Sequence, residues 1–312
     1  MRVLVTGAGG MVGRALVARL HQPTDAELLT PRRDELDLLD RAEVARYFTK
    51  HQPDVVIHAA GRVGGIADNI ADPVTFLRDN AAMGINVVGS ALDTGVARLL
   101  NIGSSCMYPR DWRQPLVEED LLQGALEPTN EGYAIAKIMT ERLCRYAAAD
   151  GKTYRTVIPS NLYGPHDHFE AARAHLVAAA IAKVHRAKTD RAPTVEVWGD
   201  GTARREFTYV DDLATWVSQV LGRLEELPVA VNAGSGTDHS VREYYELISD
   251  VVGYDGELTF DTSRPVGMRQ KLMDSSLAAA AGWRPATSLA DGLRQTYSWY
   301  LEHAAPSASG VS

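Results

Sequence analysis

Near its N-terminus the chain reads Val3-Leu4-Val5-Thr6-Gly7-Ala8-Gly9-Gly10-Met11-Val12-Gly13. A short apolar run precedes glycines spaced GxxGxxG, and a segment of helical period follows them. Glycines in this context let the backbone turn tightly and approach a pyrophosphate, which binds at the helix N-terminus through free N–H groups and the helix dipole. The stretch therefore predicts a dinucleotide-binding turn, with cofactor contacts from Gly7, Gly10, Met11, Val12 and Gly13.

The same alternation of apolar runs and helical segments continues through the first half of the chain. We expect strands at 2–6, 26–29, 55–58, 98–102 and 154–159, and helices at 11–20, 42–48, 80–92 and 133–149. Asn80 is the cap candidate for the third of these helices. Such alternation predicts a parallel sheet with helices on both faces. The expected fold class is α/β: a Rossmann-type, doubly wound parallel sheet with a smaller, mixed C-terminal substrate lobe.

After Pro159 the sequence changes character, because breakers such as Gly164-Pro165 interrupt the alternation. We expect a dinucleotide-binding domain at 1–165 and a mainly substrate-binding lobe at 166–303, with segment 209–234 returning to the first domain. The tail 304–312 is small and polar, which predicts disorder.

Composition excludes several classes of function. Among 312 residues, 32 Lys and Arg stand against 40 Asp and Glu, a net charge of −8. An acidic chain is a poor match for nucleic acid, whose backbone needs a concentrated basic face. The apolar stretches are far shorter than the roughly 20 residues that cross a bilayer, so no membrane partner is expected. Two cysteines cannot form a disulfide framework and no leader peptide is readable, which favours a cytoplasmic location.

The end of the second expected strand should reveal which dinucleotide binds. An acidic residue there receives the ribose hydroxyls of NAD, whereas a basic residue pairs with the extra phosphate of NADP. Arg32 and Arg33 stand there, ahead of Asp34, so NADP(H) is favoured, with Arg33 on the phosphate. NAD(H) stays an alternative, since exposed arginines also occur as plain surface residues. Asp37 and Leu38 are expected near the adenine.

A phenol and an ammonium group stand four residues apart, at Tyr133 and Lys137, on one face of an expected helix. A nearby cation lowers the pKa of a phenol, which makes Tyr133 a usable proton donor or acceptor. Lys137 can also hold the nicotinamide ribose. Ser104, just after the strand at 98–102, would complete a Ser-Tyr-Lys set around a sugar or alcohol carbon.

Three longer blocks are specific enough to suggest a family: Ser104-Ser105-Cys106-Met107-Tyr108-Pro109, the run 126–137, and Pro159-Ser160-Asn161-Leu162-Tyr163-Gly164-Pro165. With them the chain resembles, over about residues 1–300, the extended short-chain dehydrogenases/reductases that act on nucleotide sugars. The resemblance implies an NADPH-dependent epimerase-reductase. Its reaction would convert GDP-4-keto-6-deoxy-D-mannose to GDP-L-fucose by 3,5-epimerisation and then 4-keto reduction.

The resemblance also implies roles for individual residues. A cysteine and a histidine exchange the protons at carbons three and five in that family, and the matching positions are Cys106 and His175. His166 and His168 lie close by in sequence and are alternative partners. Tyr133, assisted by Lys137 and Ser104, would protonate the oxygen on carbon four. Cofactor contacts are implied for Ala59, Ala60, Ser160, Asn161 and Leu162. Substrate contacts are implied for Arg205 and Lys271, around the diphosphate and sugar, and for Trp198 as an aromatic wall.

Two other functions stay open. One is a nucleotide-sugar 3,5-epimerase without net reduction, similar to GDP-mannose 3,5-epimerase, although that relative is expected to carry lysine in place of His175. The other is a non-catalytic dinucleotide-binding sensor, which the joint presence of Ser104, Cys106, Tyr133 and Lys137 disfavours. The base and the sugar are not fixed by the sequence, because such pockets differ by a few loop contacts. A homodimer through two helices of the sheet domain is the family expectation.

Overall fold

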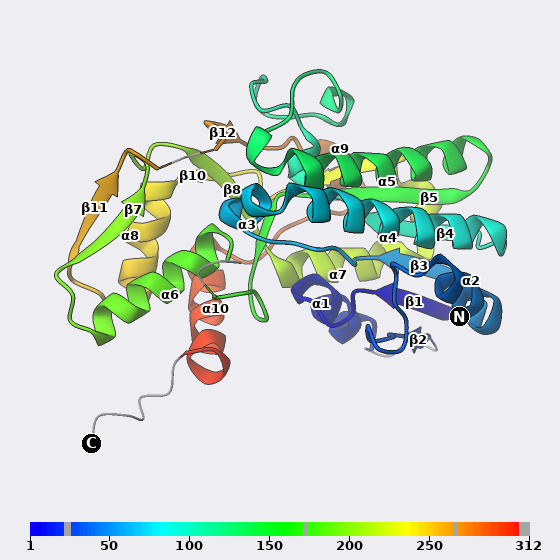
Figure 1. Ribbon diagram of the computed structural model, residues 1–312, viewed down its shortest axis with the longest axis horizontal. Coiled ribbons are helices and arrows are strands. Elements are labelled where there is room, and N and C mark those ends of the chain that lie inside the picture. Colours follow the sequence, from blue (N-terminus) through cyan, green and yellow to red (C-terminus); the bar gives the residue numbers. More distant parts are fainter. Residues whose placement is uncertain (22–25, 171–173, 265–266, 306–312) are drawn as a thin grey trace.

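The computed structural model describes residues 1–21, 26–170, 174–264 and 267–305. The tail expected to be disordered lies outside these ranges from residue 306 onward. Figure 1 shows two parts side by side, a larger one built on a sheet flanked by helices and a smaller one that contains β7, β11, α6 and α8. Among the described helices, none has the length and apolar character needed to cross a membrane.

The larger part contains a six-stranded parallel sheet in the order β2-β1-β3-β4-β5-β9. Its strands are β1 (Arg2–Thr6), β2 (Glu27–Leu29), β3 (Val55–His58), β4 (Arg98–Ile102), β5 (Thr153–Pro159) and β9 (Ala230–Ala233). The central strands are almost continuously buried, as expected for strands covered on both faces. The strand order reverses between β1 and β3, and ligands of such sheets bind outside the carboxyl ends of the strands at this reversal.

Helices cover both faces of this sheet. One face carries α1 (Met11–Leu20) and α7 (Val210–Val220), and the other carries α2 (Arg41–His51), α4 (Pro73–Asp93) and α5 (Glu131–Ala149). Along β1, Val3 and Val5 pack in the first of these cores and Leu4 in the second, because successive strand residues point to opposite faces. Cys144 is buried in the second core. The predicted doubly wound α/β class is confirmed.

Within the described residues, the smaller part contains two short sheets and three longer helices. Its four-stranded sheet joins β6 (Asn161–Tyr163), β8 (Arg204–Tyr209), β10 (Asp238–Ser240) and β12 (Gln270–Lys271), with only the β8–β10 pair antiparallel. The second sheet pairs β7 (Thr194–Trp198) with β11 (Glu257–Asp261). The longer helices are α6 (Leu176–Thr189), α8 (Val241–Val252) and α10 (Leu289–His303).

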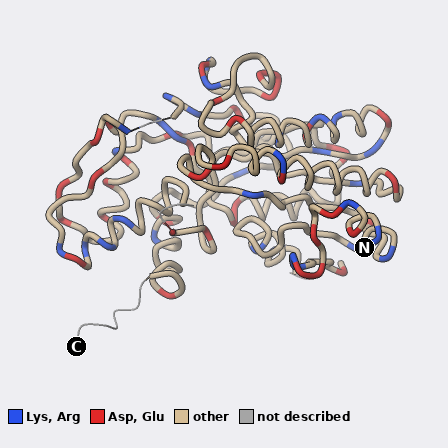
Figure 2. The backbone as a smooth tube through the Cα atoms, in the orientation of Figure 1, with Lys and Arg blue, Asp and Glu red and all other residues tan. Residues whose placement is uncertain are grey.

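Short helices complete the two parts. They are α3 (Ile66–Ala71), α9 (Ser276–Ala280), and the 3-10 helices η1 (Ser105–Met107), η2 (Glu118–Asp120), η3 (Pro128–Asn130) and η4 (Leu221–Glu226). Figure 2 shows acidic and basic residues interspersed over both parts of the molecule. Local groups of charges therefore matter more for binding than the net charge does.

The helix expected at 80–92 is longer than predicted, and the prediction that Asn80 caps it is wrong. Helix α4 begins at Pro73, and its cap is Asp72, whose carboxylate accepts the Thr75 N–H at 3.2 Å. Proline is tolerated at the first helical position because no intrahelical bond needs its missing N–H. The Asn80 amide instead donates to the backbone oxygens of Phe76 and Arg62, at 2.7 and 3.0 Å. It ties the loop after β3 to the helix.

Candidate active site

A cavity of about 2260 Å³ runs from the carboxyl ends of the main strands into the smaller part. Each residue with a predicted role lines it: Gly7, Gly10, Met11, Val12, Gly13, Arg33, Asp37, Leu38, Ala59, Ala60, Ser104, Cys106, Tyr133, Lys137, Ser160, Asn161, Leu162, His175, Trp198, Arg205 and Lys271. The cavity brings together residues that are far apart in the sequence.

The glycine turn leaves the N-terminus of α1 open to this cavity. Gly7 has a φ of +74°, and a Cβ there would lie 2.6 Å from the Cα of Ala60. A Cβ on Gly13 would overlap the carbonyl oxygen of Gly7 and lie 2.6 Å from the Cα of Ala8. Gly10 closes the turn by donating its N–H to the Gly7 oxygen at 3.0 Å. These residues form a cradle bare of side chains, which fits a pyrophosphate.

Substituting Gly13 by alanine is expected to weaken dinucleotide binding at least about tenfold and to destabilise the fold by about 1–3 kcal/mol, because the new methyl group displaces the turn. The matched control is Gly9→Ala, since a Cβ on Gly9 meets nothing within 4 Å. NADPH titration by fluorescence and a thermal melt measure the two effects. Equal affinities for the two variants would mean that the turn does not hold the pyrophosphate.

Two arginines stand at the far end of the cradle. Arg32 lies 3.4 Å from the carboxylate of Asp34 in a pair that is largely exposed. Arg33 makes no ion pair within the described part of the chain and also lines the cavity. Its guanidinium group therefore has its charge available for an anion. The Asp37 carboxylate accepts the Leu39 N–H at 3.0 Å, which fixes the local turn beside the cavity.

Ser104, Tyr133 and Lys137 meet at the carboxyl end of β4. A hydrogen bond joins Ser104 to the Tyr133 phenol, and the Lys137 ammonium donates to the Ile102 backbone oxygen at 3.0 Å. The Lys137 nitrogen lies 5.9 Å from the centre of the Tyr133 ring. Burial lowers the pKa of Lys137 to about 8. The Lys137 ammonium group thus donates one N–H to the backbone while it lies near the Tyr133 ring.

The expectation that Lys137 lowers the pKa of Tyr133 is wrong for this geometry. Burial raises the pKa of the Tyr133 phenol well above its usual value, and neighbouring Cys106 raises it further. The hydrogen bond from Ser104 lowers it only in part. Tyr133 therefore carries its proton near neutral pH.

Cys106 lies beside this set and receives contacts from both parts of the molecule. Its half-buried sulfur accepts from the Asn130 side-chain amide at 3.2 Å and lies 3.9 Å from the Lys271 ammonium group. Its backbone N–H donates to the Ser104 hydroxyl at 3.3 Å. A cation and an amide donor at the sulfur stabilise negative charge there.

His175 is linked to this thiol through Lys271, whose charge acts on the imidazole and whose ammonium group lies 3.9 Å from the sulfur. It precedes α6 and is accessible from the cavity. Burial within the cavity walls lowers the pKa of its imidazole, and the positive charges of His168 and Lys271 lower it further. His166 packs against the Trp299 ring at 4.8 Å, and exposed His168 lies 3.9 Å from Glu170. Because Lys271 acts on both His175 and Cys106, the geometry favours His175 over its two neighbours.

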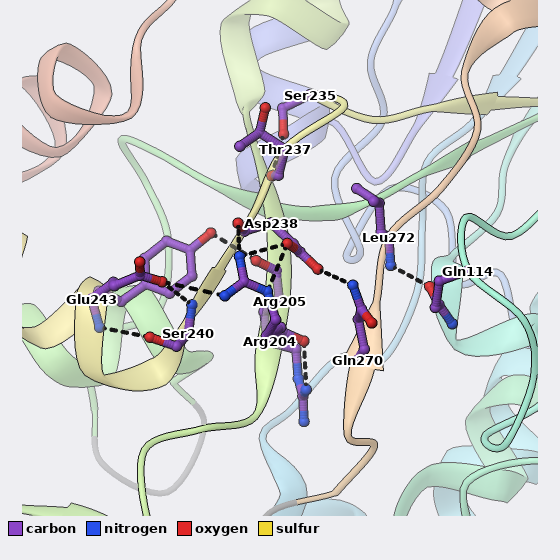
Figure 3. Close-up of polar contacts among 11 residues, drawn as sticks. Gln114, Arg204, Arg205, Ser235, Thr237, Asp238, Ser240, Glu243, Gln270 and Leu272 are labelled. Carbon is purple, nitrogen blue, oxygen red and sulfur yellow. Dashed lines mark hydrogen bonds and ion pairs between the residues drawn. The ribbon is translucent and has the colours of Figure 1, made fainter.

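Pairing between β8 and β12 sets Arg205 and Lys271 side by side, and Arg204 opposite Gln270. Figure 3 shows Arg204 and Gln270 converging on the carboxylate of Asp238, with bonds of 2.9 and 2.7 Å. Since neighbouring strand residues point to opposite faces, this cluster fixes the register that turns Arg205 and Lys271 toward the cavity. Two cations from the smaller part thus face the thiol from the larger one.

Comparison with known proteins identifies the family of this chain. The model of the NAD dependent epimerase/dehydratase family matches residues 3–234. The chain belongs to this family. A GDP-L-fucose synthase from Azorhizobium caulinodans is 46% identical over 96% of this chain and 96% of its own length. The GDP-L-colitose synthase of Yersinia pseudotuberculosis is 44% identical over 96% of this chain and 98% of its own.

A solved structure agrees with this assignment to the epimerase/dehydratase family. MlghC, a GDP-mannoheptose C4 reductase from Campylobacter jejuni with NADP bound, superposes with a TM-score of 0.86 at 32% identity, covering 96% of this chain and 98% of that chain. The resemblance drawn from the sequence blocks is therefore confirmed.

Sequence reasoning missed two residues that line the cavity of this family member. Lys183 lies eight residues after His175, about two helical turns along α6, and its ammonium donates to the Glu196 backbone oxygen. Helical spacing from His175 could have found it. Asn130 contacts the Cys106 sulfur. No spacing rule marks an amide three residues before a tyrosine, so the sequence carries no signal for that contact.

Proposed function

We propose that the chain is an NADPH-dependent epimerase-reductase that converts GDP-4-keto-6-deoxy-D-mannose to GDP-L-fucose. The observation that carries this proposal is the shared position of Ser104, which bonds both the Tyr133 phenol and the backbone of Cys106. A reductase needs only the serine, tyrosine and lysine. A thiol held beside them supplies the additional proton transfer that epimerisation requires.

Epimerisation beside a carbonyl needs a proton acceptor on one face of the carbon and a proton donor on the other. Cys106 and His175 are the proposed pair, with one proton shared between them. The Lys271 ammonium, 3.9 Å from the sulfur, stabilises the anionic thiol. The lowered pKa of His175 lets the imidazole release its proton readily near neutral pH. The two groups return to their starting states by exchange with solvent.

In the reduction step, Tyr133 donates its proton to the oxygen on carbon four. When bound, NADPH supplies the hydride for that carbon. Lys137, whose pKa is about 8, is cationic at neutral pH and holds the ribose hydroxyls beside the tyrosine. Arg205 and Lys271 hold the diphosphate and the sugar, and Trp198, which is 45% exposed, offers a ring face to the substrate.

Arg33 is proposed to select NADPH over NADH. Arg33→Ala is expected to raise the dissociation constant of NADPH about tenfold to a hundredfold and to leave that of NADH within about twofold, because only NADPH carries the extra phosphate. Arg46→Ala, an exposed arginine of α2 outside the cavity, is the matched control. Fluorescence titration with each cofactor measures the difference. An equal loss for both cofactors would contradict the assignment.

The direct test mixes the purified protein with GDP-4-keto-6-deoxy-D-mannose and follows NADPH oxidation, with NADH in parallel. Stoichiometric oxidation that yields GDP-L-fucose supports both steps. Solvent deuterium entering the sugar without oxidation favours the 3,5-epimerase alternative. If neither signal is observed, the substrate is a different nucleotide sugar or the protein has a binding function only. Because one similar relative is a GDP-L-colitose synthase, the 3-deoxy analogue of this keto sugar is the second candidate substrate, and a parallel assay with that analogue separates the two.

The same proposal includes a homodimer in the cytoplasm. Helices α4 and α5 pack side by side and expose Val74, Ile85, Ile135 and Tyr146, which suits a two-helix contact with a second copy. Light scattering that gives the mass of one chain would refute the dimer. Both cysteines are free thiols, which fits a reducing compartment.

A further inference from the structure

Asn130 stands at the N-terminus of α5 but does not serve the helix. An asparagine at this position ordinarily accepts a hydrogen bond from a backbone N–H of the first turn. The Asn130 side chain makes no such bond, and its Nδ2 instead donates to the Cys106 sulfur at 3.2 Å. Its Oδ1 is buried and has no hydrogen-bond partner within the described residues. The amide is therefore placed for the sulfur rather than for the helix.

The turn that carries Asn130 is held without its side chain. Its backbone N–H donates to the Glu127 oxygen at 3.2 Å. The Glu127 carboxylate accepts both the backbone N–H and the hydroxyl of Thr129, at 3.3 and 3.1 Å. The backbone turn at this position therefore does not depend on the Asn130 side chain.

An amide can bond a sulfur in either protonation state. Its N–H₂ end donates to a thiolate, and its oxygen end, after a half-turn about the terminal torsion, accepts from a thiol S–H. The Lys271 ammonium group, which also lies near this sulfur, lacks that freedom because it can only donate.

We propose that Asn130 is a positioning residue for Cys106. Its side-chain amide holds the sulfur toward the cavity and hydrogen-bonds it in both the thiol and the thiolate state. This inference rests on the proposed epimerisation. When the sulfur takes a proton, a carbon–hydrogen bond beside the keto group breaks, an S–H bond forms, and the electron pair stays on the substrate as its enolate. When the sulfur gives a proton, the same bonds change in reverse. The amide oxygen meets the S–H form and the amide N–H the thiolate.

The first test needs no substrate. The alkylation rate of Cys106 by iodoacetamide, followed by peptide mass spectrometry at neutral pH, is expected to fall about tenfold or more in Asn130→Asp, because a carboxylate repels the thiolate and lacks an N–H. Asn130→Ser, which keeps a group able to cap α5, is expected to lose about threefold to tenfold. Glu131→Gln, which removes a neighbouring exposed charge, is the control and should stay within about twofold.

Cys144 serves as the internal control for misfolding. It is fully buried and reacts with iodoacetamide only when the protein unfolds. The proposal is overturned if Cys144 stays protected and the alkylation rate of Cys106 is unchanged in both Asn130 variants. The second test measures deuterium incorporation at carbons three and five of the GDP-keto sugar. In the Asn130 variants, incorporation is expected to fall about tenfold while the affinity for NADPH is unchanged. Slower alkylation with unchanged incorporation also overturns it. Wild-type protein that incorporates no deuterium refutes the proposed function instead, while the alkylation series still reports on the contact.

Discussion

Replacing Tyr133 by phenylalanine is expected to slow reduction at carbon four by about 10²–10⁴-fold. The phenol is the proposed proton donor, and burial keeps its pKa well above the usual value, so that it carries its proton near neutral pH. Phenylalanine fills nearly the same volume and removes only the hydroxyl. NADPH oxidation in the presence of the GDP-keto sugar measures the loss. Deuterium incorporation at carbons three and five should persist, because that exchange does not use the phenol.

The matched control for this variant lies on the same helix. Tyr146 is 65% exposed and lies outside the cavity, so Tyr146→Phe is expected to leave the reduction rate unchanged. A Tyr133→Phe protein that reduces the sugar within about threefold of the wild-type rate would remove Tyr133 from the proton transfer.

Replacing Cys106 by serine is expected to block deuterium incorporation at carbons three and five by about 10²–10⁴-fold while sparing hydride transfer. A serine hydroxyl is far less acidic than a thiol, so neither Lys271 nor Asn130 can hold it as an anion. The product would be a GDP-sugar reduced at carbon four without inversion at its neighbours. Mass spectrometry and NMR of the product in deuterated solvent measure both steps. Unchanged exchange would exclude Cys106 from the mechanism.

Cys144→Ser is the companion to this variant. Burial raises the pKa of the Cys144 thiol to about 12, and the residue lies in the core between the main sheet and α5. We expect both chemical steps to survive and the free energy of unfolding to fall by about 1–3 kcal/mol, because a more polar and smaller group replaces the buried sulfur, with Thr156 as its hydrogen-bond partner. Loss of activity in both cysteine variants would point to misfolding rather than chemistry.

The strands of the first half can be predicted because their signal is local. Continuous apolar runs bounded by turns predict β1, β3 and β4 with the bounds that the structure has. The first turns of α4 are harder to predict, because a proline inside a helix breaks it, whereas Pro73 at the first helical position costs no hydrogen bond. The effect of this one residue depends on its place in the helix.

The members of the site can be predicted from the sequence, but their contacts cannot. The motif spacing places Tyr133 and Lys137 together, but burial decides the pKa of the phenol, and burial depends on the whole fold. The register that turns Lys271 toward Cys106 depends on pairing between β8 and β12, which are more than sixty residues apart. Nothing in the local pattern around either strand encodes that pairing.

The route of the chain between the two parts limits how this protein could be rebuilt. After β5 the chain enters the smaller part at β6, returns for α7 and β9, and leaves again at β10. A chain truncated after residue 165 would lose the edge strand β9 and the buried face of α7 that carries Leu213 and Trp216. Substrate preference therefore cannot be transplanted by splicing one contiguous block from a relative. A working chimera needs matched exchanges on both sides of the α7–β9 return.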